Sequence, residues 1–185
     1  AWLAEHSPLA PDALEGGARF LYLGAGHLIA TIPVLAAAAL LAVRRVKPAT
    51  YRFEDDGIVP NHPRWPLILY RNAIPATPKR EPAAVIDAIF EANGWRRSWR
   101  DTIYDFVHYH SQIHEVLGVA AGSGTVEFGG VKGRRITLRR GDVAVLPAGT
   151  GHRLLDATRD FLVVGAYPAT GAYDDISVFT DTETL

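Results

Sequence analysis

Apolar and polar residues follow three different patterns along the chain. Residues 20–43 form an almost unbroken run of apolar and small residues, which ends at a basic cluster within 44–47. Residues 82–93 place apolar side chains at helical spacing, with a proline in the first turn and a glycine after the last. From residue 99 onward, short β-type runs alternate with glycine turns. The chain is therefore expected to hold one substantial helix followed by a mainly β region.

The β-type runs are short and regularly spaced, which is typical of a sandwich or barrel. They read TIYDFVHYH, HEVLGVAAG, GTVEFGG, RRITLRRG, DVAVLPAG, HRLLDA and DFLVVGAYP. An earlier run at 65–71, WPLILYR, has strand length and proline neighbours, and we expect it to be an edge or exchanged strand. A homodimer formed through the sheets is the corresponding prediction.

The apolar run at 20–43 is long enough to span a bilayer. Acidic residues precede it and basic residues follow it, an asymmetry that would keep the C-terminal part in the cytoplasm. The alternatives are a buried or oligomer-forming helix, or an extension that the working protein never carries. We expect an N-terminal extension at 1–47 and a separable domain at 48–185, either cytoplasmic or membrane-anchored with the domain on the cytoplasmic side.

The amino-acid composition excludes several kinds of functional site. The chain of 185 residues has 19 basic and 20 acidic side chains and a formal net charge of -1, so nothing favours nucleic-acid binding. It has no cysteine, which excludes disulfides, iron–sulfur clusters and thiol nucleophiles. Any metal site must therefore use nitrogen and oxygen ligands.

The stretch HYHSQIHEVLG concentrates such ligands. His108 and His110 share one face of a strand, and a hairpin return would bring Glu115 opposite them. Imidazole nitrogens and a carboxylate suit Fe(II), Mn, Ni, Cu, Co or Zn. His114 has the opposite parity to Glu115, so we expect it to turn outward as a rim residue rather than a ligand. The pattern predicts a metal site, with use of these residues as acid and base, or a barrel without metal, as the alternatives.

Two motifs in the sequence resemble those of the cupins, which are double-stranded β-helix (jelly-roll) barrels. The first cupin motif, with HxH, a glutamate and a closing glycine, is matched by His108, His110, Glu115 and Gly122. The second is matched by Gly141, Pro147, Gly149 and His152. Thr102 and Asp156 depart from the usual glycine and asparagine, at positions that are not metal ligands in the family.

The resemblance covers roughly residues 50–170, and the amino-acid sequences of the two motifs are similar to those of bacterial single-domain YjlB-like cupins. It implies a mainly β barrel with one helix before the motifs and an apolar helical extension. It also implies that His152 joins His108, His110 and Glu115 in holding a divalent transition metal.

The function that the resemblance implies is that of a metal-dependent enzyme, an oxygenase or isomerase, acting on a small organic molecule. A non-catalytic cupin that binds or senses a small molecule or carbohydrate is the alternative, since a fold does not decide function. A membrane-tethered assembly module is a third reading, which requires 20–43 to be inserted. The catalytic residue is open, with Tyr104, Gln112 and His114 as candidates near the metal cluster.

Overall fold

The computed structural model describes residues 43–76 and 80–178. The expected N-terminal extension and its apolar run therefore lie outside the described residues, apart from 43–47. In the described ranges no helix is both long and apolar enough to cross a bilayer. Residues 43–47 already contact the domain, because Val43 and Val46 pack against its core and the Arg44 amide donates to the Ala73 carbonyl (2.8 Å).

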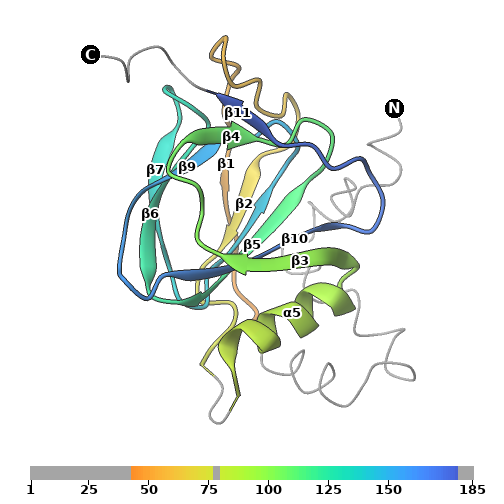
Figure 1. Ribbon diagram of the computed structural model, residues 1–185, viewed down its shortest axis with the longest axis vertical. Coiled ribbons are helices and arrows are strands. Elements are labelled where there is room, and N and C mark those ends of the chain that lie inside the picture. The colour runs from red at the N-terminus through yellow and green to blue at the C-terminus, as the bar shows by residue number, and fades with distance from the viewer. Residues whose placement is uncertain (1–42, 77–79, 179–185) are drawn as a thin grey trace.

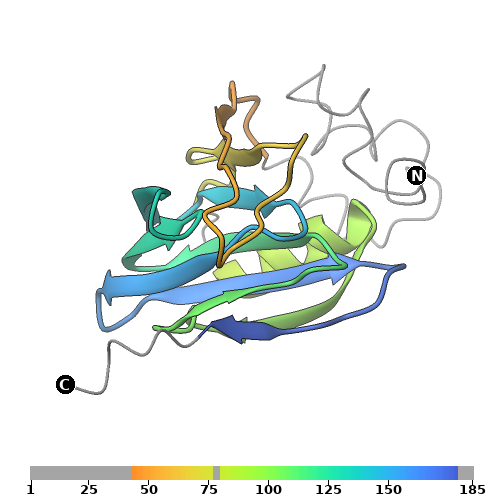
Figure 2. The ribbon, with the colours of Figure 1, turned by 90° about the horizontal axis from the view of Figure 1, so that it is seen from above.

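Two antiparallel sheets form the described part of the chain (Figure 1). The first sheet has the order β1-β2-β8-β5-β10-β3 and the second has the order β11-β4-β9-β6-β7. The strands of the first sheet are β1 (Ala49–Tyr51), β2 (Leu67–Tyr70), β3 (Trp95–Asp101), β5 (Glu115–Ala121), β8 (Val143–Leu146) and β10 (Leu162–Pro168). Those of the second are β4 (Val107–Tyr109), β6 (Ser123–Phe128), β7 (Arg134–Arg139), β9 (His152–Ala157) and β11 (Ile176–Val178). Figures 1 and 2 show β11, in dark blue, beside β4.

The central strands of the first sheet are buried on both faces, and the alternation of their side chains explains why. In β2, Leu67 and Leu69 face the space between the sheets, whereas Ile68 and Tyr70 face helix α5 (Pro82–Ala92). The strands β5 and β8 divide their apolar side chains in the same way. Strands buried on both faces read as continuous apolar runs, which is why LILY and VAVL have no polar positions.

Helix α5 covers the outer face of this sheet and forms where the sequence predicted it. The Glu81 carboxylate accepts hydrogen bonds from the amides of Ala83 (2.9 Å) and Ala84 (2.7 Å), which caps the helix N-terminus. Asn93 caps the other end, and Gly94 leaves the helix with a φ of 86°. The buried stripe of α5 comprises Ala83, Val85, Ile86, Ile89 and Phe90.

Two expectations about the strands were wrong. The 65–71 run is not an edge strand, because β2 lies between β1 and β8. Its short neighbour β1 is the edge instead. The run TIYDFVHYH is not one long strand, since only Val107–Tyr109 pairs. The exchanged strand and the homodimer stay predictions.

Candidate metal centre

Four buried polar side chains from three strands meet between the two sheets. His108 lies on β4, and it pairs across the sheet with His152, the first residue of β9. Glu115 opens β5 in the opposite sheet, and His110 follows directly after β4. All four side chains are at least nine-tenths buried. The structure thus brings together the four residues that the sequence singled out.

The turn of the second motif joins the two motifs physically. Gly149 has a φ of 85°, a left-handed conformation that suits glycine, and its amide donates to the His110 carbonyl (2.7 Å). The Thr150 amide donates back to the Pro147 carbonyl (3.1 Å), which closes a tight turn directly before His152. The PxG sequence therefore sets where the last histidine stands relative to the first two.

Hydrogen bonds fix the same tautomer in all three histidines of the cluster. Nδ1 of His108 lies 3.3 Å from the Phe106 carbonyl, and Nδ1 of His152 lies 3.1 Å from the Thr150 carbonyl. Nδ1 of His110 contacts the carbonyl of Asp174. A carbonyl oxygen can only accept, so each Nδ1 carries the proton and each Nε2 keeps a lone pair when the ring is neutral.

The Glu115 carboxylate faces two of these nitrogens. Oε1 lies 3.7 Å from Nε2 of His110, and Oε2 lies 3.3 Å from Nε2 of His152. Burial raises the pKa of Glu115, but the nearby His110 and His152 outweigh it and hold that pKa well below its usual value. Burial lowers the pKa of His110, but Glu115 outweighs it and raises it to about 9. Burial and the charge of His152 lower the pKa of His108 to about 3.

His114 differs from these three and corrects an expectation. It is not a rim residue: it is 2% exposed and packs against Trp65, with ring centroids 5.3 Å apart. Its Nδ1 accepts a hydrogen bond from the Ala148 amide (2.8 Å), so the neutral ring carries its proton on Nε2. Burial and the nearby His62 lower its pKa to about 4. This tautomer offers no Nε2 lone pair to a metal ion.

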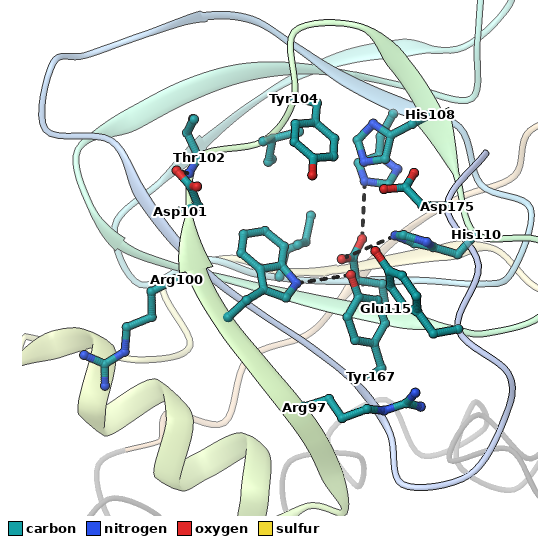
Figure 3. A pocket seen from close by; sticks show the side chains of 15 residues that line it. Arg97, Arg100, Asp101, Thr102, Tyr104, His108, His110, Glu115, Tyr167 and Asp175 are labelled. Atoms are coloured by element: carbon teal, nitrogen blue, oxygen red, sulfur yellow. Dashed lines mark hydrogen bonds and ion pairs between the residues drawn. The ribbon is translucent and has the colours of Figure 1, made fainter. Parts of the chain in front are cut away.

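The cluster forms one end of a pocket of about 440 Å³ (Figure 3). Of the three expected acid/base candidates only Tyr104 lines it, while Gln112 and His114 do not. The remaining lining residues include Arg97, Trp99, Tyr167, Tyr173 and Asp175, none of which the sequence indicated.

One of these aromatic side chains reaches the cluster. The Trp99 indole N–H donates to the Tyr167 hydroxyl (3.2 Å), and the Tyr167 ring lies 5.2 Å from that of His110. Burial, and then the charge of Glu115, raise the pKa of Tyr167, so the hydroxyl keeps its proton at neutral pH. It is therefore a wall residue that can donate a hydrogen bond toward the cluster.

A comparison with known sequences shows the family of this chain. No family profile matches the chain. The two facing antiparallel sheets with one covering helix confirm the mainly β fold that the sequence predicted. The chain is 42% identical over 125 residues to the uncharacterized protein YjlB of Bacillus subtilis (strain 168), covering 68% of this chain and 72% of that protein. The chain therefore belongs to the same family as that protein.

More distant resemblances come from solved structures. They include acireductone dioxygenase from Bacillus anthracis with a cadmium ion in its active center (TM-score 0.41, 16% identity, 61% of this chain, 83% of that one). Oxalate decarboxylase from Lactobacillus farciminis, in a formate complex, gives a TM-score of 0.35 and 18% identity, covering 61% of this chain. The chain spans only 25% of that decarboxylase. The WlaRB TDP-quinovose 3,4-ketoisomerase from Campylobacter jejuni gives 0.35 and 17%, covering 40% of this chain and 63% of that one.

Proposed function

We propose that this protein binds one divalent transition-metal ion and uses it to act on a small organic molecule. The ligands would be Nε2 of His108, His110 and His152 and the carboxylate of Glu115. One observation carries the proposal: the three histidines all have Nδ1 held by a carbonyl, and His114, one residue from Glu115, has the opposite tautomer. Metal-ligating histidines are usually oriented by such a hydrogen bond from the second nitrogen.

The residues present fit a cation. Oε2 of Glu115 is buried and makes no hydrogen bond of good geometry, although Nε2 of His152 lies 3.3 Å away. A buried carboxylate oxygen without a well-placed donor is costly, and a cation would satisfy it. Nitrogen and oxygen donors of this type suit Fe, Mn, Ni, Zn, Co or Cu.

Side chains of the cluster would have to adjust to hold an ion. Among the described residues, no group of three or more His, Asp or Glu side chains is already spaced as the ligands of one metal. The physical reason is that the histidine–glutamate contacts use the same lone pairs that would bind the ion. Metal binding would replace these contacts, a change of side-chain torsions within a fixed backbone.

The protein supplies positioning around the ion. A bound ion of this kind would supply Lewis-acid chemistry to a substrate, water or O2 in the pocket. The backbone carbonyls of Phe106, Asp174 and Thr150 orient the three imidazoles. Trp99 lines the pocket and donates to the Tyr167 hydroxyl. In Figure 3, Tyr167 lies next to Glu115, and Tyr104 offers a hydroxyl at the opposite wall.

A second candidate function is binding of a small molecule or carbohydrate without turnover. The observation that favours it is that, of the three acid/base candidates predicted from the sequence, only Tyr104 lines the pocket. Metal-dependent conversion of a bound molecule, measured against a metal-free control, separates this function from the enzymatic one.

Metal analysis of the full chain, purified without a nickel column, tests the ligand set. We expect about one equivalent of metal per chain in the parent protein and well under one in His110→Ala and His152→Ala. His114→Gln is the matched control, because it removes a buried imidazole beside the cluster and should keep the metal. Full occupancy in both alanine variants, with folded far-UV spectra, would refute the assignment.

A further inference from the structure

Strand β3 contains a backbone irregularity directly on the pocket wall. Gly165 of β10 pairs with Trp99 and Tyr167 pairs with Arg96, so β3 has two residues, Arg97 and Ser98, where β10 has only one. Arg97 adopts a φ of 53°, in the left-handed region. The other described non-glycine residues with positive φ are asparagines, which tolerate that region well. An arginine there is strained, and β-bulges next to active sites serve to redirect a side chain.

The Arg97 side chain lies beside Tyr167 at the edge of the pocket. Its Nη2 donates to the Pro168 carbonyl (3.1 Å), and its guanidinium carbon lies 6.0 Å from the centroid of the Tyr167 ring. In the view of Figure 3, Arg97 and His108 lie at opposite ends of the pocket wall, with Tyr167 between them. The strained backbone conformation of Arg97 thus occurs at a residue whose side chain lines the pocket.

Arg97 is also the lining arginine whose charge is not balanced. Arg100 lines the same pocket, but it pairs with Asp87 (2.6 Å) and Glu81 (3.2 Å). In the described ranges no carboxylate lies within ion-pair distance of Arg97. One carbonyl acceptor leaves most of its five N–H donors available.

The aromatic residues that line the pocket together with Arg97 suit a ligand with a flat apolar part. Three tyrosines line the pocket, with the rings of Tyr167 and Tyr173 5.0 Å apart and that of Tyr104 5.0 Å from His108. Aromatic faces favour flat apolar groups, and the volume of about 440 Å³ suits a small molecule. A planar guanidinium pairs best with a carboxylate, through two parallel hydrogen bonds. The pocket also carries the carboxylates of Asp101, Glu115 and Asp175, so a ligand with one negative charge suits Arg97 better than a phosphate, which carries more charge.

We propose that the pocket binds a small planar carboxylate, with the carboxylate on Arg97 and the body against the tyrosine rings that line the pocket, pointing at the metal cluster. This assignment deepens the proposed function and rests on it for the identity of the far end of the pocket. Arg97 is then the residue that selects anionic over neutral ligands.

Calorimetric titration of the full chain with benzoate and with benzamide, its neutral counterpart, tests the proposal. Benzoate should bind the parent protein more tightly than benzamide, and Arg97→Gln should weaken benzoate roughly tenfold or more without changing benzamide. Arg96→Gln is the matched control, with the same charge change on the same strand outside the pocket, and should leave benzoate binding unchanged. The Arg97→Gly variant separates loss of binding from loss of folding, because glycine relieves the positive φ at this position. The thermal midpoint of this variant should equal or exceed that of the parent protein, while its benzoate binding falls.

The same titrations in chelator-treated and zinc-loaded protein separate the two proposals. If the protein binds no zinc but still binds benzoate in an Arg97-dependent way, the proposed metal function is overturned and the carboxylate assignment stands. Equal affinity for benzoate and benzamide, no measurable benzoate binding, or an unchanged Arg97→Gln variant would overturn the carboxylate assignment. Tighter Arg97-dependent binding of inorganic phosphate than of benzoate would also overturn it.

Discussion

Replacing Asp174 by alanine should loosen His110 without removing any ligand of the cluster. The Asp174 carboxylate accepts hydrogen bonds from the Ser111 amide (2.9 Å), the Ser111 hydroxyl (2.5 Å) and the Gln112 amide (3.2 Å). Its backbone carbonyl contacts Nδ1 of His110. The side chain thus holds the turn after His110 against the segment before β11, and so aligns the carbonyl that orients the imidazole.

The size of the effect follows from these contacts. Hydrogen bonds to a buried charged group contribute about 1.5–3 kcal/mol, but these three are exposed, so we assign roughly 0.5–1 kcal/mol to each. Their loss should cost about 2 kcal/mol, or about 4–8 °C in thermal midpoint for a domain of this size. Loss of a group that orients a metal ligand typically weakens the metal site about 10- to 100-fold.

Two assays measure the two consequences in Asp174→Ala. Differential scanning calorimetry in chelator gives the stability change, and calorimetric titration with Zn²⁺ gives the affinity. Asp156→Ala is the control, because Asp156 is an exposed aspartate on β9, the strand that carries His152. An unchanged Zn²⁺ affinity together with the expected loss of stability would show that the turn supports the fold but does not orient His110.

Three further predictions concern other parts of the chain. Zinc at about 100 times its dissociation constant should stabilise the parent protein by about 2.7 kcal/mol in urea unfolding, and Glu115→Gln should lose most of that gain; an equal gain would contradict ligation by Glu115. Gly118→Ala places a methyl group 2.7 Å from Cγ2 of Ile86, so it should lower the free energy of unfolding by about 1–3 kcal/mol while zinc affinity stays unchanged. Deleting residues 1–42 should leave circular dichroism and zinc stoichiometry intact, and an insoluble or zinc-free product would refute separability of that segment.

The helix and the motif strands could be predicted because their signals are local. The cap and the terminal glycine of α5 place its ends within a residue, and continuous apolar runs mark β2 and β8. Strand β3 escaped prediction because its sequence, WRRSWRD, is polar and bulged, as an edge strand can be. Nothing in the residues between 95 and 101 indicates that they pair with β10.

Some residues of the site could likewise be predicted from local sequence, and others could not. His108, His110 and Glu115 were predictable because a short strand and a turn bring them together within eight positions. The prediction that His114 turns outward was wrong, because it assumed strand alternation. Strand β5 begins only at Glu115, and a loop residue does not follow that alternation. Trp99 and Tyr167 reach the pocket, and Asp174 reaches His110, only through pairing of strands that are distant in sequence. The one local signal that was overlooked is the YDD stretch at 173–175.

The division of the cluster between the two sheets has a mechanical consequence. Glu115 belongs to the sheet that α5 covers, whereas His108 and His152 belong to the other. An ion held by all of them would act as a cross-link at one mouth of the sandwich, where β11 is attached to β4 alone among the described strands. Separation of the layers would then require metal release, so amide protons of β4 and β9 should exchange faster with deuterium in chelator, and proteases should cut there first. The same ion would set both the reactivity of the pocket and the rate at which this end of the protein opens.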